Sequence, residues 1–291
     1  MAKKPSLTLI ILNYNTQFWL KKTLTSLNKH YRQKTQTKLS TVVVDNASED
    51  QSVAMVKKEF PWVKLMALPK NLGYATANNL ALKKVQTDYC MLLNSDVEFT
   101  AATKLDQLIK FLADNPKIAV ITPRVELENG KLDWACHRGE PTPWASLTYF
   151  AKLEKLCPQR PSCAQYHQKY KDLNTIHEID ACSGAAMMVK TAAMKKVGFL
   201  DERFFIYAED LDWCKRFRDA GYQVAYHPLV KIIHHKYKAG LESRDAHVSF
   251  ETKRHFYNTM LQYYDKHYRE HYPELVRWLL RVVLFIKRGG F

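Results

Sequence analysis

The sequence predicts an α/β protein: a doubly wound, mostly parallel sheet followed by a C-terminal helical extension. Apolar runs such as 7–12 and 89–93 alternate with helical spacing such as 18–27 over the first half of the chain, the pattern of strands joined by crossover helices. A chain of 291 residues is long enough for one large domain with an extension. No strand-like run follows 230–233, so we expect a sheet domain at 1–240 and a helical extension at 241–291.

The first half supplies the core of the sheet. The mostly apolar run 7–12 predicts a strand covered on both faces, and Leu20, Leu24 and Leu27 have helical spacing. In chain order the same criteria predict a strand at 41–44, a helix from a cap at Ser48 or Asp50 to Phe60, a strand at 63–68, a helix at 74–85, a strand at 89–93, a helix at 105–112 and a strand at 118–121.

The second half is more irregular. Asn129-Gly130 predicts a short hairpin over 125–135, and the prolines, aromatics and lysines of 141–175 indicate an insertion or lid. We then expect, in order, a strand at 185–189, a helix capped by Thr191 and ending at Gly198, a helix at 206–220 closed by Gly221, strands at 224–226 and 230–233, and helices at 250–268 and 275–287.

Polar clusters follow three of the predicted strands. They are Asn13-Tyr14-Asn15, Asp45-Asn46 and Asn94-Ser95-Asp96. Ligands of such sheets bind beyond the carboxyl ends of the strands, so these clusters are expected along one edge.

Charge and cysteine content narrow the classes of protein. The net charge is +15 with a pI near 9.4, which favours anionic partners such as phosphorylated substrates, lipid headgroups or nucleic acid. The six cysteines form no CxxC pair or zinc-finger spacing. We expect free thiols, Cys157 and Cys163 included, and a reducing cytoplasmic compartment.

Two groups of side chains suit a divalent cation. A carboxylate at Asp96, with Asn94 and Ser95 beside it, fits a hard cation that also holds phosphate oxygens; the alternative is a simple turn or helix cap. His234 and His235 end a strand and face opposite sides of it, and either could join Asp96 or remain a structural histidine.

Two further segments suggest binding and catalysis. Glu209 and Asp210 open a helix after an aromatic run. Adjacent carboxylates near an apolar wall can produce a general base, whereas the alternative is complementation of the helix dipole. Residues 71–79 couple a glycine turn to a helix start that could bind an anion, without a Walker A or GxGxxG pattern.

Taken in order, several segments resemble the family 2 glycosyltransferases, in the branch of bacterial rhamnosyltransferases. The resemblance covers about residues 7–240. Its segments are ILNYN (11–15), VVVDNASED (42–50), NLGYATANN (71–79), LLNSDVEF (92–99), HRGEPTPW (137–144), CSGAAMMVK (182–190), VGFLDERFFIYAEDLDWCKR (197–216) and HPLVKIIHH (227–235).

The resemblance implies the GT-A fold and transfer from a nucleotide-diphospho-sugar with inversion of configuration. It implies Mg²⁺ or Mn²⁺ held by Asp96 and His234, and an acceptor base at Asp210 with Glu209 beside it. The nucleotide side would be formed by Tyr14, Asp45, Asn71, Gly73, Asn79 and Asn94, and the donor or acceptor pocket by Ser183, Gly184 and Ala185.

The sequence departs from the family at two places. Asn94 occupies the first position of the family's DxD, and the loop 236–240 is more basic than usual. The QxxRW element and membrane spans of processive synthases are missing, so transfer of one or a few sugars is expected. dTDP-rhamnose is the leading donor, with a UDP-hexose second. A sugar nucleotidyltransferase and a nucleic-acid-binding protein are rivals, but neither the phosphate loop of the first nor the RNA-contacting aromatics of the second are present.

The C-terminal segment suggests a membrane surface. Residues 275–286 are apolar but interrupted by Arg277 and Arg281, too short to span a bilayer yet typical of an interfacial helix. The alternative is a helix docked on the body. We therefore expect a peripheral enzyme on the inner face of the cell membrane, with a saccharide or polyprenyl-diphosphate-linked acceptor.

Overall fold

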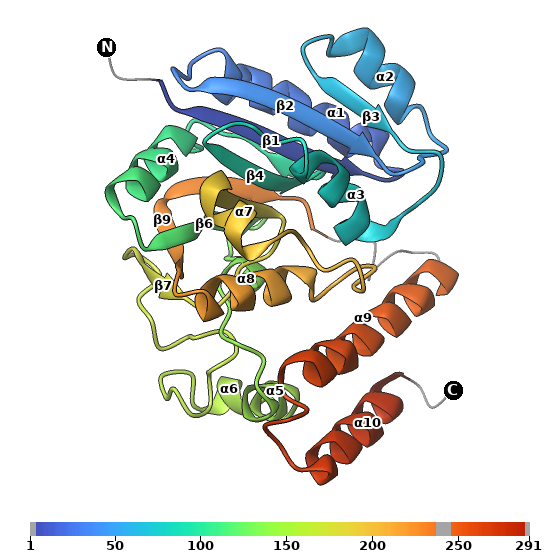
Figure 1. Cartoon of the computed structure of the whole chain (residues 1–291), viewed down its shortest axis with the longest axis vertical. Helices are drawn as coiled ribbons and strands as arrows, with labels where there is room; N and C mark the ends of the chain where they lie inside the picture. The colour runs from blue at the N-terminus through green and yellow to red at the C-terminus, as the bar shows by residue number, and fades with distance from the viewer. Residues whose placement is uncertain (1–3, 237–245, 289–291) are drawn as a thin grey trace.

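The described residues form one mixed sheet. The computed structural model describes residues 4–236 and 246–288, with the side chains of 246–253 and 286–288 excepted. Nine strands pair in the order β3-β2-β1-β4-β8-β6-β9-β5, with β7 on β9 (Figure 1). Their bounds are β1 Ser6–Asn13, β2 Lys38–Asp45, β3 Lys64–Ala67, β4 Tyr89–Asn94, β5 Val97–Glu98, β6 Ile118–Leu127, β7 His177–Ile179, β8 Ala186–Lys190 and β9 Gln223–His234.

The apolar runs explain the centre of this sheet. Strands β3, β2, β1 and β4 are mutually parallel, and the consecutive residues Leu9, Ile10 and Ile11 of β1 are fully buried. Because neighbouring side chains in a strand point to opposite faces, helices must cover both faces. The expected α/β fold is confirmed, and antiparallel β8 joins its two parallel halves.

Helices connect and cover the strands. Their bounds are α1 Gln17–Leu27, α2 Ser52–Glu59, α3 Gly73–Leu82, α4 Leu105–Asp114, α5 Pro143–Phe150, α6 Leu153–Leu156, α7 Thr191–Val197, α8 Glu209–Asp219, α9 Ala246–His267 and α10 Glu274–Arg288, with a π-helical turn at Asn28–Arg32 and a 3-10 turn at Trp134–Cys136. Helix α3 packs on β1 and β2, and α8 packs on β6 and β9. This packing brings the starts of α3 and α8 to the same part of the molecule.

Several predicted elements differ from the structure. Helix α8 begins at Glu209 rather than 206, because Tyr207 and Ala208 have φ of 69° and 63°. The strands predicted at 224–226 and 230–233 form one strand, β9, whose pairing with β6 shifts at His227. The turn at 129–130 exists, but its second arm forms a single β-bridge, Glu126 with Leu132, rather than a strand of its own.

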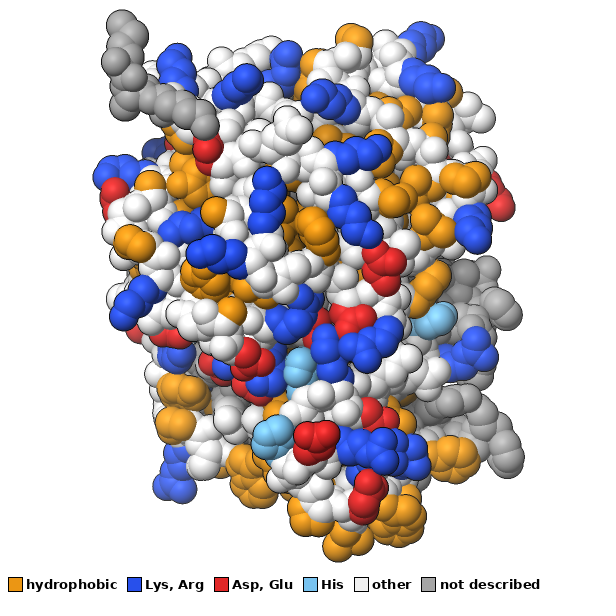
Figure 2. All heavy atoms as spheres, viewed as in Figure 1, with side chains coloured by type: hydrophobic (Ala, Val, Ile, Leu, Met, Phe, Trp, Pro, Cys, Tyr) orange, Lys and Arg blue, Asp and Glu red, His pale blue; other side chains and the backbone are white. Residues whose placement is uncertain are grey.

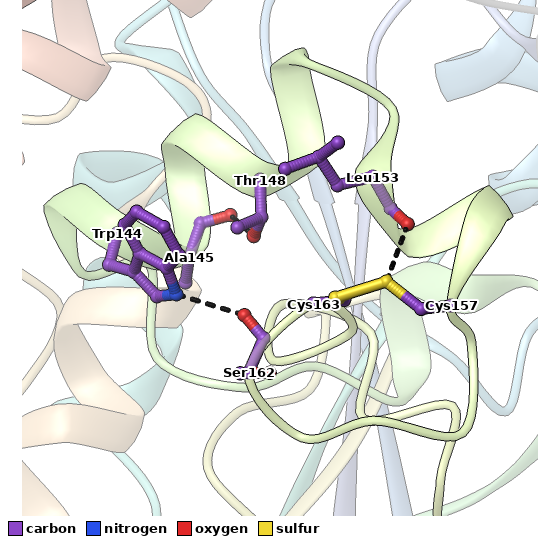
Figure 3. The surroundings of a disulfide bond; sticks show 7 residues. All are labelled: Trp144, Ala145, Thr148, Leu153, Cys157, Ser162 and Cys163. Atoms are coloured by element: carbon purple, nitrogen blue, oxygen red, sulfur yellow. Dashed lines mark hydrogen bonds between the residues drawn. A yellow bond between two sulfur atoms is a disulfide. The ribbon is translucent and has the colours of Figure 1, made fainter.

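The expectation of free thiols at Cys157 and Cys163 is wrong. The two residues form a disulfide with a Cα–Cα distance of 6.0 Å (Figure 3). A tight turn brings them together, since Cys163 N–H donates to Arg160, whose own N–H donates to the Cys157 carbonyl. The disulfide closes the loop after α6 in the lid, where the Trp144 indole donates to the Ser162 carbonyl at 2.9 Å. The other four cysteines are free and buried.

The C-terminal helices are fastened by ion pairs. Lys266 of α9 pairs with Asp212 in α8 and with Asp201. Arg277 of α10 pairs with Asp265 of α9 at 2.5 Å, so this arginine holds the helical hairpin rather than facing outward. In the described part of the chain, no helix has the length and apolar character to cross a membrane. The predicted boundary at 240 lies outside the described residues.

Candidate functional site

The polar ends of β1 and β2 meet, as the sequence predicts. Asn13 pairs in register with Asp45, and its amide donates to the Asp45 carboxylate at 2.8 Å. The second Asp45 oxygen accepts from the Ser48 N–H at 2.9 Å. Asp45 is 1% exposed, so in this structure it shapes the loop after β2 as well as lying at the edge.

The predicted nucleotide side also contains an exposed aromatic ring and a fixed glycine turn. Tyr14 is 45% exposed, leaving its ring available for stacking on a base. Asn71 accepts from the Asn46 amide at 2.8 Å and from Gly73 N–H at 2.9 Å. Gly73 has φ of 78°, and a Cβ there would lie 2.5 Å from the Phe205 carbonyl oxygen. Only glycine allows this loop to pack against the segment before α8.

Asn79 lies apart from these contacts. Its amide donates to the Leu200 carbonyl and to Glu202, both at 2.9 Å, and its oxygen accepts from Leu200 N–H. Because every polar group of this side chain is used by the protein, Asn79 holds the loop after α7 in place.

Asp96 and His234 come together at the next strand ends. The His234 Nε2 lies 3.2 Å from the Asp96 carboxylate and 3.3 Å from the Asn94 amide. The His234 Nδ1 lies 2.9 Å from the carboxylate of Asp133, which Lys236 also contacts at 2.7 Å. Burial alone would lower the pKa of His234, but the hydrogen bonds from Asp133 and Asp96 outweigh it and raise the pKa to about 9.

These residues fit a divalent cation that takes its other ligands from a diphosphate. A metal-binding imidazole usually has its second nitrogen held by a carboxylate, which Asp133 does here. In the described residues no group of three or more His, Cys, Asp and Glu side chains could hold a metal alone. Magnesium commonly binds through one or two carboxylates together with substrate phosphates.

His235 faces away from this cluster. Its ring packs on Trp19 with centroids 4.6 Å apart, and its Nε2 lies 2.8 Å from Glu98. Since successive residues leave a strand on opposite faces, His234 is the histidine beside the Asp96 side chain.

The two carboxylates at the start of α8 have different surroundings. Asp210 forms a 2.7 Å ion pair with Arg138 and accepts from its neighbour Leu211. Glu209 is 5% exposed, and its Oε2 has no hydrogen-bond partner among the described residues. Burial, and then the charge of Asp210, raise the pKa of Glu209 well above its usual value.

Tyr74 links this pair to the predicted pocket at 183–185. Its hydroxyl donates to the Gly184 carbonyl at 3.2 Å, and its N–H donates to Phe205 at 2.6 Å. Burial, with the charges of Glu209 and Asp210, raises its pKa well above 10. Ala185 accepts from the Asn94 N–H, and Ser183 Oγ is buried without a hydrogen-bond partner in the part of the chain that the structure describes. The pocket residues therefore lie between Asn94 and Tyr74.

Three residues of the site escaped the sequence analysis as individuals: Tyr74, Asp133 and Arg138. Tyr74 lies inside the segment 71–79, and Arg138 lies inside HRGEPTPW. Asp133 follows the predicted hairpin turn, and nothing in the local pattern distinguishes it from an ordinary turn aspartate.

Comparisons with known proteins show the family and the fold of this chain. Residues 8–188 match the family model described as glycosyl transferase family 2. The chain is 25% identical over 264 residues to the N-acetylglucosaminyl-diphospho-decaprenol L-rhamnosyltransferase of Mycobacterium tuberculosis, covering 87% of this chain and 83% of that protein.

Solved structures show the same fold. The mannosyltransferase PcManGT of Pyrobaculum calidifontis, in complex with GDP-Man and Mn²⁺, has a TM-score of 0.62 at 17% identity over 99% of this chain and 72% of that chain. TarS 1-349 of S. aureus, in complex with UDP-GlcNAc, has a TM-score of 0.58 at 19% identity over 97% of this chain and 72% of that chain. The expected GT-A architecture is confirmed. With the family model covering more than half of its length, the chain belongs to glycosyl transferase family 2 and is a glycosyltransferase that uses a nucleotide-sugar donor.

Proposed function

We propose that this enzyme transfers L-rhamnose from dTDP-rhamnose to a lipid-linked saccharide, with inversion at the anomeric carbon. The observation that supports the reaction is the pairing of Asp210 with Arg138 at 2.7 Å, which holds a carboxyl group beside the predicted pocket. The choice of rhamnose and of a lipid-linked acceptor is supported by the similarity to the mycobacterial rhamnosyltransferase.

The chemistry follows from the residues on this edge. The Asp210 carboxylate accepts the proton of the acceptor hydroxyl as that oxygen attacks the anomeric carbon, a contribution of about 10²–10⁴ in rate. Tyr14 stacks on the base, and Asn71 and Gly73 shape the cleft beside it. Ser183, Gly184 and Ala185 bound the space for the sugar.

A divalent cation, Mg²⁺ or Mn²⁺, would be held by Asp96 and His234. It would supply positive charge to the nucleoside diphosphate as that group departs. Asp133 would orient His234 by holding its Nδ1, and Lys236 balances the Asp133 charge at 2.7 Å. Burial alone would raise the pKa of Asp133, but His234 and Lys236 hold it well below its usual range.

The test is nucleoside-diphosphate release from a panel of dTDP-, UDP- and GDP-sugars with Mg²⁺ or Mn²⁺. We expect dTDP-rhamnose to be turned over fastest and EDTA or Asp96→Ala to abolish turnover. A UDP-hexose preference would replace the proposed donor. Full activity in EDTA would contradict the metal site, and no release from any sugar would contradict the proposed reaction.

We also propose that the enzyme lies on an anionic membrane surface, on the cytoplasmic side. Thirteen large hydrophobic residues of the described chain are exposed, and eight of them lie on α5, α6 and α10: Trp144, Leu147, Leu156, Leu275, Trp278, Leu279, Val283 and Phe285. These helices lie at the same end of the molecule (Figure 1), where hydrophobic side chains gather on the visible face (Figure 2). Lys152, Lys155, Arg160 and Arg281 are exposed on or beside them, which suits anionic headgroups.

A further inference from the structure

Arg138 is fixed by backbone contacts on both sides. Its N–H donates to the Ala181 carbonyl at 3.0 Å, and its carbonyl accepts from Ala181 at 2.9 Å. The next residue, Gly139, donates to the Tyr166 carbonyl in the lid at 2.7 Å, and a Cβ on it would lie 2.0 Å from the Gln165 carbonyl oxygen. The arginine therefore enters the site from a rigid junction between the sheet and the lid.

The Arg138 side chain meets Asp210 in a nearly dry environment. The guanidinium lies 2.7 Å from the carboxylate, and the two side chains are 11% and 12% exposed. Removing one member of such a buried pair leaves an uncompensated charge. The contact thus fixes the position of the Asp210 carboxyl group.

Glu209 has no comparable partner. The described residues provide it with no ion pair, and its buried Oε2 accepts no hydrogen bond. Two adjacent buried carboxyl groups accompanied by one cation cannot both ionise readily. The Arg138 guanidinium contacts Asp210. We therefore assign the shared proton to the Glu209 carboxyl group.

We propose that Arg138 is a positioning residue that keeps Asp210 ionised as the acceptor base while Glu209 remains uncharged beside it. The inference rests on the proposed function and adds an assignment of charge to it. During transfer the acceptor O–H bond breaks and its proton passes to Asp210. The acceptor oxygen bonds to the anomeric carbon, and the bond from that carbon to the diphosphate oxygen breaks with its electrons. Without Arg138 the carboxyl groups of Glu209 and Asp210 would share a proton at neutral pH. Asp210 would then already carry a proton part of the time and could not accept one from the acceptor hydroxyl.

The test uses Arg138→Met, which removes the charge at similar volume, and Arg138→Lys, which keeps the charge. The pH dependence of kcat and KM for nucleoside-diphosphate release is measured for each variant, alone and with Asp210→Asn. For Arg138→Met we expect kcat at pH 7 to fall about 10–100-fold and to recover toward alkaline pH, with KM for the nucleotide sugar within about threefold. Arg138→Lys should keep the wild-type pH profile, and adding Arg138→Met to Asp210→Asn should cause no further loss of kcat.

Two kinetic results would overturn the proposal. One is an unchanged pH profile in Arg138→Met, and the other is a large rise in KM with kcat intact, which would make Arg138 a contact to the nucleotide sugar.

Melting temperature tests the pairing without any turnover. Arg138→Met should lower Tm, and Asp210→Asn in the same chain should restore part of the loss because it removes the unpaired buried charge. Lack of restoration would overturn the pairing. If the double variant regains Tm but the wild type releases no nucleotide from any sugar, the proposed reaction has failed instead. If Arg138→Met does not fold, recovery of folding in Arg138→Met with Asp210→Asn would support the pairing, and no recovery would overturn it.

Discussion

The start of α8 holds two carboxylates in opposite electrostatic situations. Asp210 has a guanidinium at 2.7 Å, while Glu209 is buried and its Oε2 has no hydrogen-bond partner among the described residues. Desolvation favours the neutral form of Glu209. Two neighbouring residues of similar chemistry therefore have different roles in our account.

Asp210→Asn should lower kcat by about 10²–10⁴ while the nucleotide still binds, because the change removes basicity and little volume. Steady-state kinetics and calorimetric titration of the nucleoside diphosphate check this. Asp219→Asn is the matched control, since that residue lies at the other end of α8 with a 55% exposed side chain. Near wild-type activity in Asp210→Asn together with an inactive Glu209→Gln would reverse the two roles.

Gly184→Ala should disrupt the pocket because its new Cβ would lie 2.2 Å from the Tyr74 hydroxyl oxygen. The ring of Tyr74 is held by packing, so we expect a loss of about 1–3 kcal/mol in the free energy of unfolding. Tyr74→Phe in the same chain removes the clashing atom and should restore part of it, as denaturant titration can show. Unchanged stability in Gly184→Ala would mean that Tyr74 moves freely.

Residue types and strand ends allowed part of the site to be predicted from the sequence. Asp96 and His234 are both expected at strand ends, and the structure places their side chains 3.2 Å apart. Arg138 and Asp133 were missed as individuals because their contacts span 72 and 101 residues of sequence. No local periodicity encodes such contacts; they depend on how the lid and the hairpin turn pack on the sheet.

At the scale of elements, buried strands were predicted better than irregular junctions. The run 7–12 formed a strand because its consecutive apolar residues, interrupted only by Thr8, are buried on both faces. The start of α8 was missed because Tyr207 and Ala208 adopt left-handed conformations, which these residue types do not predict. Such φ values at non-glycine residues are typical of strained functional segments.

His137 anchors the lid, and its burial should make the folding stability of the protein decrease at acidic pH. Its Nδ1 contacts the His167 carbonyl at 2.9 Å, and burial lowers its pKa to about 4. As the pH falls from about 6.5 to about 4, the unfolded chain binds this proton first. Stability that is present above pH 6.5 is therefore lost on acidification, by up to about 3 kcal/mol.

Urea unfolding between pH 7.5 and 4 measures this effect. Over this pH range the free energy of unfolding should fall more for the wild type than for His137→Gln. The difference between the two should not exceed about 3 kcal/mol. His271→Gln changes an exposed histidine and should behave as the wild type does. Parallel pH curves for the wild type and His137→Gln would refute the assignment.

At the scale of the whole molecule, we propose different functions for the sheet edge and for the exposed apolar helices. The α9–α10 hairpin is attached to the catalytic body by the Lys266–Asp212 contact and is closed by Arg277–Asp265. A membrane bound at α10 would thus be mechanically connected to the helix that begins with Glu209 and Asp210.

Trp278→Glu together with Arg281→Glu should release the protein from anionic vesicles while leaving nucleotide release intact. Each basic residue near such a surface contributes about 1 kcal/mol, and this part should weaken with salt because the Debye length is about 8 Å at physiological ionic strength. The apolar part, roughly 25 cal/mol per Å², should persist. Co-sedimentation measures both parts.

The control for this experiment is Leu229→Glu, which changes a residue of β9 that is 66% exposed. Arg277 is left unchanged, because its reversal would break the hairpin. If the wild-type protein does not co-sediment with anionic vesicles, α10 is a structural helix docked on the body and the membrane proposal is wrong.

The central claim is that this sheet edge transfers a sugar in a single inverting displacement with Asp210 as the base. It is tested most directly by incubating the enzyme with dTDP-rhamnose, Mn²⁺ and a diphospholipid-linked N-acetylglucosamine acceptor, and reading the anomeric configuration of the product by NMR. The account predicts a rhamnosyl product of configuration opposite to the donor, formed by the wild type and lost in Asp210→Asn. A product that retains the donor configuration, or one formed equally well by Asp210→Asn, would contradict it.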